Sequence, residues 1–581
     1  MATHVEIELK FDVDAAFALP DLLPLPEVDT LEQPKEQVLQ ATYFDALDLR
    51  LLRGRITLRR RTGGGDEGWH LKLPAAGRAR LEVHRPLGRA TRTVPPALVE
   101  LVEPRVRGAA LAPVVTMTTH RTVHRLLGPG GVELAEVADD TVTAEVLPSG
   151  PGEALEISTW REIELELIDG DEALLEAASA LLLRAGARPA GVGSKLARAL
   201  GSRLTPEAPA GGQATSEVVP EKDGKAKAGK AKASKAKTGK GKRGKAKAGK
   251  AKERPQPAPV PTAGSVAAAY LSGQARDLLV WDPHVRVDTD DAVHRMRVAA
   301  RRMRSALATF KPFVDAEALA PLREELRWLG GVLGTARDAE VLHDRLVARA
   351  RALSPDLLLG PVVARLDAEL RQAYRDAHEG ALRELRGARY FALVEQLEAL
   401  LLQVPAGADA ALPVAALGPR VRKAVRRMEA AVASAREAVT ALASAQEAAA
   451  GAAVDSLAVA LAGQHRDEAL HEVRKAAKRV RYAAEAVADV VGSDATRLAN
   501  AAEQAQELLG DHQDGVVAAA VLRETAVRAH LAGENAFSYG VLLGRDALGW
   551  EAVPGEPDPT SMLIDAAWHG VRRAAKGWPG R

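Results

Sequence analysis

The sequence predicts an α+β protein with two structural domains: a β-rich N-terminal domain, then a lysine-rich segment and an all-helical C-terminal domain. Three observations lead to this prediction. Residues 4–11 alternate polar and apolar side chains without a break, as a half-buried β-strand does. The chain after residue 263 is rich in Ala, Leu and Val with helical spacing of its apolar positions. Two stretches within that helical part also match each other.

Length and composition narrow the possible classes. At 581 residues the chain is too long for a single hydrophobic core. It contains no cysteine, which excludes disulfide bonds and thiolate metal sites. There is no run of about 18 uncharged apolar residues and no signal-peptide pattern at the N-terminus. We therefore expect a cytoplasmic protein without a membrane span.

The first predicted strand, residues 4–11, carries two carboxylates and an amine on one face. Glu6, Glu8 and Lys10 follow one another in steps of about 6.5 Å, because a strand rises about 3.3 Å per residue. Carboxylates can hold a hard divalent cation such as Mg²⁺, and an ammonium group can bind phosphate oxygens that the cation bridges. The alternative is a polar face that is simply exposed to solvent.

Further runs between residues 37 and 146 alternate in the same way and are separated by Gly and Pro. Residues 160–167 then repeat the opening pattern. Their polar faces carry charges of both signs, which a closed sheet with a charged interior explains better than solvent exposure does. The main charged positions are Arg59, Arg61, Lys72, Glu82, Arg121, Glu162, Glu164 and Glu166.

These motifs resemble the CYTH domains, or triphosphate tunnel metalloenzymes. The family signature Glu-x-Glu-x-Lys stands here as Glu6, Glu8 and Lys10, and the later strand motifs follow in the family's order up to Lys195. The resemblance covers about residues 3–203. It implies an eight-stranded antiparallel β tunnel with flanking helices, which binds a triphosphate together with Mg²⁺ or Mn²⁺.

The same resemblance implies roles for individual residues. Catalytic roles fall to Glu6, Glu8 and Lys10. Metal ligands would be Glu6, Glu8, Glu82, Glu162 and Glu164, with Asp139 or Asp140 as a further candidate, while His84 stands where the family usually has another acid. Phosphate oxygens would be bound by Arg59, Arg61, Lys72, Arg121 and Lys195. Such a site acts through the cation and preorganised charges and needs no covalent nucleophile.

Residues 205–262 are predicted to be a disordered linker between domains at 1–204 and 263–581. The stretch 222–254 has 13 Lys and 2 Arg against two acids, which gives it a charge of +13. Since the formal net charge of the whole chain is +2, the rest of the chain has a net charge of −11. Such a composition cannot bury a core. It can serve either as a polycation that binds polyanions or as a self-repelling spacer, and the composition fits both.

The helical part contains an internal repeat. Residues 294–304 match residues 471–481 at an offset of 177, and a second pair, around Gly334 and Gly510, recurs at an offset of 176. On a helical wheel, the basic residues of 294–304 fall on one arc, opposite an apolar arc, and the basic residues of 471–481 do the same. An ordinary exposed helix face would mix charge signs, so these arcs indicate an anionic partner. The arcs consist of His294, Arg297, Arg301 and Arg304, and of His471, Arg474, Lys478 and Arg481.

These stretches resemble the CHAD family of histidine-bearing α-helical domains, whose signature is His-x-x-Arg-x-x-x-[Arg/Lys]-x-x-Arg. The resemblance covers about residues 264–550. It implies two helical bundles related by a pseudo-two-fold axis around a basic channel that binds inorganic polyphosphate. Arg337, Arg420, Lys423 and Arg427 are further candidates for that channel, and Gln513 stands where the first half has Arg337.

The predicted function is therefore metal-dependent hydrolysis of inorganic triphosphate or a related triphosphate, coupled to polyphosphate binding. The first alternative is a weakly catalytic or non-catalytic polyphosphate-binding protein at cytoplasmic polyphosphate granules. The second alternative is a nucleic-acid-binding protein that binds mainly through the linker. The 3% aromatic content disfavours it, because few rings are available to stack on bases. The sequence does not define an oligomeric state.

Overall fold

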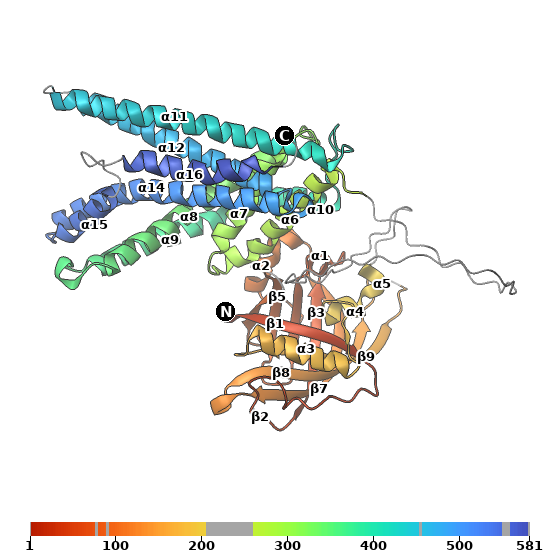
Figure 1. The fold of residues 1–581 in the computed structure, drawn as a ribbon. Helices are drawn as coiled ribbons and strands as arrows, with labels where there is room; N and C mark the ends of the chain where they lie inside the picture. The colour runs from red at the N-terminus through yellow and green to blue at the C-terminus, as the bar shows by residue number, and fades with distance from the viewer. Residues whose placement is uncertain are drawn as a thin grey trace, which may run out of the picture. The chain divides into compact units, whose positions relative to one another are not determined.

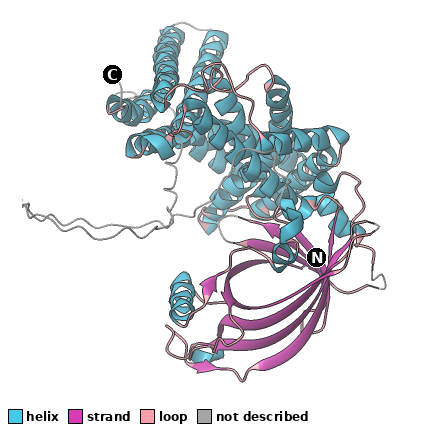
Figure 2. Cartoon of the chain, turned by 90° about the vertical axis from the view of Figure 1, so that its right-hand side faces the viewer, coloured by secondary structure: helices cyan, strands magenta, loops and turns pink. Residues whose placement is uncertain are grey.

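The structure is a computed structural model of the whole chain. It describes residues 2–75, 79–88, 92–150, 152–204, 260–451, 456–548 and 558–578. The predicted α+β class is confirmed: strands occupy the N-terminal part and helices the C-terminal part (Figures 1 and 2). The predicted linker lies outside the described residues except for positions 260–262. Among the described residues, no helix is long and apolar enough to cross a membrane.

Eight antiparallel strands form a closed barrel, as predicted. Their order around the barrel is β1-β6-β5-β4-β3-β7-β8-β9, and β9 pairs with β1 to close it. Two short strands, β2 (Thr30–Leu31) and β10 (Arg188–Pro189), extend the sheet. The eight barrel strands are β1 (Ala2–Val13), β3 (Lys35–Asp45), β4 (Thr57–Thr62), β5 (Gly68–Pro74), β6 (Arg80–Arg85), β7 (Ala112–Leu127), β8 (Glu133–Val146) and β9 (Glu156–Leu167).

Strand β1 is the seam of the barrel. Its residues 2–6 pair with β6, whereas residues 7–13 pair with β9. The charged face of this strand turns inward, so Glu6 is only 6% exposed while Ile7 on the outer face is 39% exposed. The alternation was predicted correctly, but the buried side of this part of the strand is the charged one. This inversion is what a closed sheet with a polar interior produces.

Helices cover the outer surface of the barrel at two places. Helix α2 (Pro96–Val106) packs Leu98 and Val102 against a cluster that includes Trp69 of β5. Helix α3 (Glu172–Arg184) begins at Asp171, whose carboxylate accepts a hydrogen bond from the backbone N–H of Leu174 at 2.9 Å. Its leucines pack on β1 and β9. The short helices are α1 (Arg50–Arg53), α4 (Lys195–Ala199) and α5 (Gly201–Leu204).

The C-terminal part is built of long helices that pack mainly on their sequence neighbours. Helices α6, α7, α8 and α9 pack in succession, as do α11, α12, α14 and α16, and α7 contacts α12 between the two sets (Figure 1). Helix α6 begins at a capping box between Thr262 and Ser265. The bounds are α6 (Ala263–Arg286), α7 (Ala292–Thr309), α8 (Ala320–Arg351), α9 (Val362–Leu385), α10 (Ala388–Leu402), α11 (Gly418–Gly451), α12 (Ser456–Glu485), α13 (Ala488–Val491), α14 (Ser493–Leu531), α15 (Phe537–Leu548) and α16 (Pro559–Lys576).

The predicted apolar arcs of α7 and α12 are buried in one hydrophobic core. Met296, Ala300 and Met303 of α7 are fully buried, and so are Val473 and Val480 of α12. Because the apolar arc of each helix faces this core, its basic arc is left for the opposite side. The repeat in the sequence thus corresponds to two equivalent helices that meet in the structure.

Candidate functional site

The interior of the barrel contains a cavity of about 430 Å³ whose lining is mostly charged. Seven carboxylates and nine Lys or Arg side chains line it among the described residues, so neither sign dominates. Of the residues predicted for the barrel, all but Glu162 line the cavity: Glu6, Glu8, Lys10, Arg59, Arg61, Lys72, Glu82, Arg121, Glu164 and Lys195.

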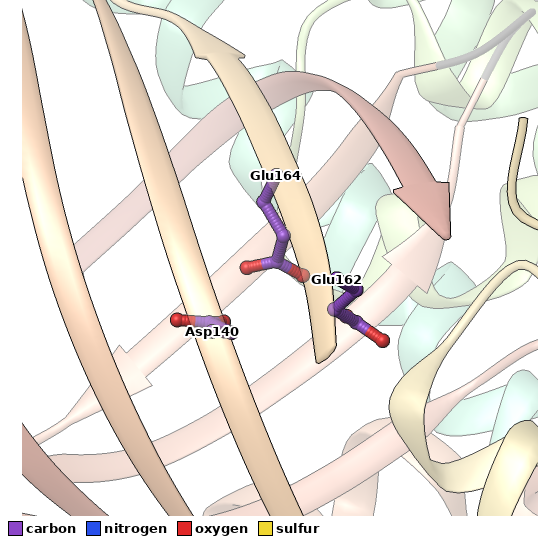
Figure 3. A group of neighbouring side chains, drawn as sticks. All are labelled: Asp140, Glu162 and Glu164. Atoms are coloured by element: carbon purple, nitrogen blue, oxygen red, sulfur yellow. The ribbon is translucent and has the colours of Figure 1, made fainter. Parts of the chain in front are cut away.

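Three carboxylates converge at one side of the barrel wall. Asp140 of β8 is directly opposite Glu162 of β9 in the register, and Glu164 lies two residues further along the same face (Figure 3). One carboxylate oxygen of each lies within 4.8 Å of the others. A set of three oxygen donors at this spacing fits a hard divalent cation such as Mg²⁺ or Mn²⁺.

The ammonium group of Lys195 lies between these three carboxylates. Its Nζ is 2.9 Å from Asp140, 2.8 Å from Glu162 and 2.6 Å from Glu164. Helix α4 positions this side chain, because the helix starts at Lys195 and is capped by the hydroxyl of Ser194. Burial raises the pKa of Asp140 and Glu164, but the neighbouring lysine and arginine charges outweigh burial and hold both pKa values below the usual range.

A second group of acids lies around Lys72. Its Nζ is 2.5 Å from Glu6 and 3.2 Å from Glu82, while Glu82 also contacts the imidazole of His70. Burial and the neighbouring Glu82 raise the pKa of Glu6 to about 8. The pKa of Glu82 is lowered, because His70 and the nearby cations outweigh its burial. Of the two acids, Glu6 is therefore the one that holds a proton more readily.

The five predicted metal ligands do not form a single cluster. Glu162 and Glu164 join Asp140, Glu6 and Glu82 share Lys72, and Glu8 is paired with Lys10 at 3.0 Å. Of the two acids left open on β8, the structure places Asp140 at the cluster. Asp139 points to the other face and pairs with Arg161 at 2.7 Å.

The predicted phosphate-binding cations all face the same cavity. Arg121 pairs with Asp140 at 2.7 Å and with Glu164 at 2.5 Å. The buried Nε atoms of Arg59 and Arg61 have no hydrogen-bond partner in the described part of the chain, so they are free to donate to a bound anion. Sequence reasoning assigned no site role to Lys35, Arg80, Arg125 and Glu136, which also line the cavity. The alternation of their strands is the feature that could have identified them.

The helical part contains two basic cavities of about 480 Å³ each: the first helical cavity, which Arg304 and Arg420 line, and the second helical cavity, which His294 and Arg337 line. Both are lined by Arg297 and Arg301 of α7 and by His471 and Lys478 of α12, so these four residues lie where the two cavities adjoin. Eleven of the twelve predicted channel residues line one or both: His294, Arg297, Arg301, Arg304, Arg337, Arg420, Lys423, Arg427, His471, Arg474 and Lys478.

Equivalent glycines explain the second repeated motif. A Cβ placed on Gly334 would lie 3.6 Å from the guanidinium of Arg297, and one on Gly510 would lie 3.0 Å from that of Arg474. Each arginine thus crosses the next long helix at its glycine. Each also reaches an aspartate at 3.6 Å, Asp338 for Arg297 and Asp514 for Arg474.

The two halves differ at the last basic residue of the signature. Arg304 lines the first helical cavity, but Arg481 lines neither. Arg481 is instead 2.7 Å from Glu485 and 2.8 Å from Glu503. The cavities also include Arg323, Arg345, Lys475 and Arg479, which sequence reasoning did not assign.

The cations of the helical cavities depress one another's proton affinity. Burial, together with Arg337, lowers the pKa of His294 to about 4. Burial and the charges of Arg474, Arg301 and Arg297 lower the pKa of Lys478 to about 7. Crowded cations of this kind create a strong positive potential in a site of reduced dielectric.

These features define a protein with a closed β barrel that has a charged interior, and with a duplicated basic helical domain. The chain matches the CYTH domain family over residues 4–197 and the CHAD domain family over residues 269–523. It belongs to the proteins that combine a CYTH domain with a CHAD domain. The uncharacterized protein Rv2226 of Mycobacterium tuberculosis H37Rv is 38% identical over 563 residues, which span 94% of this chain and 93% of that protein. The values for protein MT2285 of strain CDC 1551 are the same.

Solved structures show partial similarity. PptA from Streptomyces chartreusis is 24% identical, with a TM-score of 0.38, and covers 54% of this chain and 99% of its own. The CHAD domain from the plant Ricinus communis is 26% identical, with a TM-score of 0.36, and the match covers 55% of this chain and 97% of that domain's chain. HpAC1 from Hippeastrum, which has a dominant triphosphatase activity, is 19% identical, with a TM-score of 0.22, and the match covers 35% of this chain and 98% of HpAC1.

Proposed function

We propose that the CYTH domain hydrolyses inorganic triphosphate or a related triphosphate with the aid of Mg²⁺ or Mn²⁺, and that the CHAD domain binds inorganic polyphosphate. The observation that carries the proposal is the barrel cavity, which has nine basic side chains in its lining and shares Glu164 with the three-carboxylate cluster in the adjoining barrel wall. Asp140, Glu162 and Glu164 would hold the cation. When bound, the cation neutralises phosphate charge and polarises the phosphoryl oxygens.

The protein's own residues bind and orient the phosphates. Arg59, Arg61, Lys72 and Arg121 face the cavity from three different strands, so they can contact several phosphoryl groups at once. Hydrolysis breaks one phosphoanhydride P–O bond, forms a P–O bond to water and transfers a proton to the phosphate products. The charges in the cavity favour the developing negative charge without a covalent intermediate.

The lining favours an inorganic chain over a nucleotide. Tyr43 is the only aromatic residue among the described residues that line the barrel cavity, and its hydroxyl is 3.4 Å from Arg59. A nucleobase would find little apolar surface to stack on. Inorganic triphosphate, by contrast, presents oxygen acceptors along its whole length, which suits this lining.

A second candidate function is polyphosphate binding without efficient hydrolysis. The observation that favours it is the position of Lys195, whose ammonium fills the space between the three acids. Under this alternative the barrel would act as a phosphate-binding module of a granule-associated protein. We also propose the cytoplasm as the location, 1–204, 205–262 and 263–581 as the domain limits, and no specific nucleic-acid partner.

Phosphate release from tripolyphosphate by the full chain tests the proposal. We expect activity with Mg²⁺ or Mn²⁺ that EDTA abolishes, and at least a 100-fold loss in a Glu162→Gln, Glu164→Gln variant, on the order of what removed electrostatic contacts cost. Glu156→Gln, an exposed position of the same strand, is the matched control. A wild-type protein that binds tripolyphosphate but does not turn it over would favour the second candidate. Competition between polyphosphate and DNA would test the proposed ligand class.

A further inference from the structure

Two buried hydroxyl groups occupy equivalent positions of the two helical repeats. Ser305 of α7 and Tyr482 of α12 each follow directly after the last basic residue of the signature, so they are also related by the repeat offset. Both residues line the first helical cavity. Neither hydroxyl oxygen has a hydrogen-bond partner within the described part of the chain, although both atoms are buried.

The cavity that these two hydroxyls line is rich in hydrogen-bond donors and poor in acceptors. The first helical cavity is lined by ten Lys or Arg side chains and, among the described residues, by no Asp or Glu. The Nε atom of Arg301, close by on α7, is also buried without a partner. Because an unsatisfied buried hydroxyl is costly, its partner is expected to come from the occupant of the cavity, as an acceptor.

The ring of Tyr482 is held by its neighbours. The guanidinium groups of Arg301, Arg302 and Arg481 lie 5.7 Å, 5.9 Å and 5.9 Å from its centroid. Only 2% of the residue is exposed. A tyrosine that only supported these arginines would need its ring and not its hydroxyl, so Phe would serve that purpose equally well.

We propose that the hydroxyls of Ser305 and Tyr482 donate hydrogen bonds to phosphoryl oxygens of a polyanion bound in the first helical cavity. The inference rests on the proposed polyphosphate binding and adds two uncharged contacts to it. Cations attract any polyanion, whereas a hydroxyl requires an acceptor atom at a defined position. The two hydroxyls therefore give the cavity a preference for ligand geometry beyond total charge.

Calorimetry of the full chain with linear polyphosphate tests this assignment. We expect about a tenfold loss of affinity for Tyr482→Phe, which corresponds to about 1.4 kcal/mol. A smaller loss is expected for Ser305→Ala, and the two losses should multiply in the double variant. Because these bonds are neutral on the protein side, the factor lost should change little between low and high salt, unlike the loss caused by removing an arginine.

Tyr270→Phe is the matched control. The hydroxyl of Tyr270 is also buried without a partner among the described residues, but Tyr270 does not line either helical cavity. It should bind polyphosphate as the wild type does. A second readout is the tyrosine absorption difference spectrum on ligand binding, which should appear in wild type and disappear in Tyr482→Phe.

The outcomes separate the inference from the function on which it rests. Wild-type affinity in both Tyr482→Phe and Ser305→Ala would overturn the inference alone, and so would an equal loss in Tyr270→Phe. A wild-type chain that does not bind polyphosphate would overturn both. A loss confined to the two cavity hydroxyls, with unchanged thermal unfolding, would support the assignment.

Discussion

The barrel cavity and the first helical cavity are both rich in lysine and arginine, yet their charge balance differs. Seven carboxylates accompany nine cations in the barrel, and many of these groups pair with each other. The first helical cavity has ten cations and no carboxylate among its described lining residues. The barrel is thus close to neutral before any ligand arrives, and the helical cavity is not.

The difference indicates what each cavity requires of its ligand. A barrel with paired charges can accept a cation and an anion together, since each replaces a partner that is already present. A cavity of crowded cations is relieved only by negative charge, and a chain of phosphates supplies it at regular spacing. Substitutions in both cavities test this contrast.

The largest effect is expected from charge reversal where the helical cavities adjoin. Arg297→Glu with Arg301→Glu should lower affinity for long-chain polyphosphate more than about 100-fold, because two attractions at half-buried positions become repulsions. Tripolyphosphate hydrolysis by the barrel should be unchanged. Calorimetry and phosphate release measure the two effects. The matched control reverses the exposed Arg276 and Arg351, which line neither cavity, and an equal loss there would contradict a specific channel.

Removing Lys195 should show that the barrel's balance depends on internal pairing. Lys195→Met leaves three neighbouring carboxylates without their shared ammonium group, and breaking such a buried pairing costs about 3–5 kcal/mol. We expect a lower melting temperature of the barrel in EDTA and partial recovery with Mg²⁺, measured by differential scanning calorimetry. Lys35→Met, at an exposed position on the same cavity, should have little effect. Equal melting temperatures for wild type and Lys195→Met would contradict the role of Lys195.

Polyphosphate binding should weaken as the pH rises through about 7. The pKa of Lys478 is lowered to about 7 by burial and neighbouring arginines, and a bound polyanion raises it again because it favours the charged ammonium. Affinity is therefore highest below pH 7 and falls by at most tenfold per pH unit above it. Lys478→Arg should flatten the profile because arginine stays protonated. Lys475→Arg, at an exposed position of the first helical cavity, should show the same pH profile as the wild type.

The smallest expected effect on polyphosphate affinity distinguishes Arg304 from Arg481, the last basic residues of the two repeated signatures. Arg304→Ala removes a cation from the first helical cavity, and we expect about a threefold to tenfold loss of polyphosphate affinity. Arg481→Ala removes a cation that already pairs with Glu485 and Glu503, so its effect should stay below about twofold. Equal losses in a side-by-side titration would show that Arg481 leaves its acids for the ligand.

Local patterns predicted the fold well because they are set by backbone geometry. The alternation in β1 placed Glu6, Glu8 and Lys10 on one face of that strand. The helical spacing in α7 placed Arg297 and Arg301 on one face of that helix. In both cases the structure directs these faces to a cavity. The repeat offset also predicted correctly that two equivalent helices carry the basic arcs. Closure of the barrel followed from the number of strands with charged faces.

Partners from distant elements were not predictable in the same way. The choice between Asp139 and Asp140 depends on which face of β8 turns inward, and two adjacent acids leave that open. The diversion of Arg481 depends on Glu503 of α14, which no spacing within α12 reveals. Similarly, the division of five acids into separate groups follows from where Lys72 and Lys195 reach, which is a property of packing.

The seam at β1 has a consequence for the order in which the two domains become functional during folding. Lys10 on this strand meets Glu164 of β9, 154 residues further along the chain. Such a pairing requires closure of a long loop, which is slow, whereas neighbouring helices form contacts between residues close in sequence. After dilution from denaturant, the chain should therefore regain polyphosphate binding before it regains hydrolysis. The candidate catalytic residues Glu6, Glu8 and Lys10 lie on the strand that completes the barrel, so a partly closed barrel would lack the proposed active site.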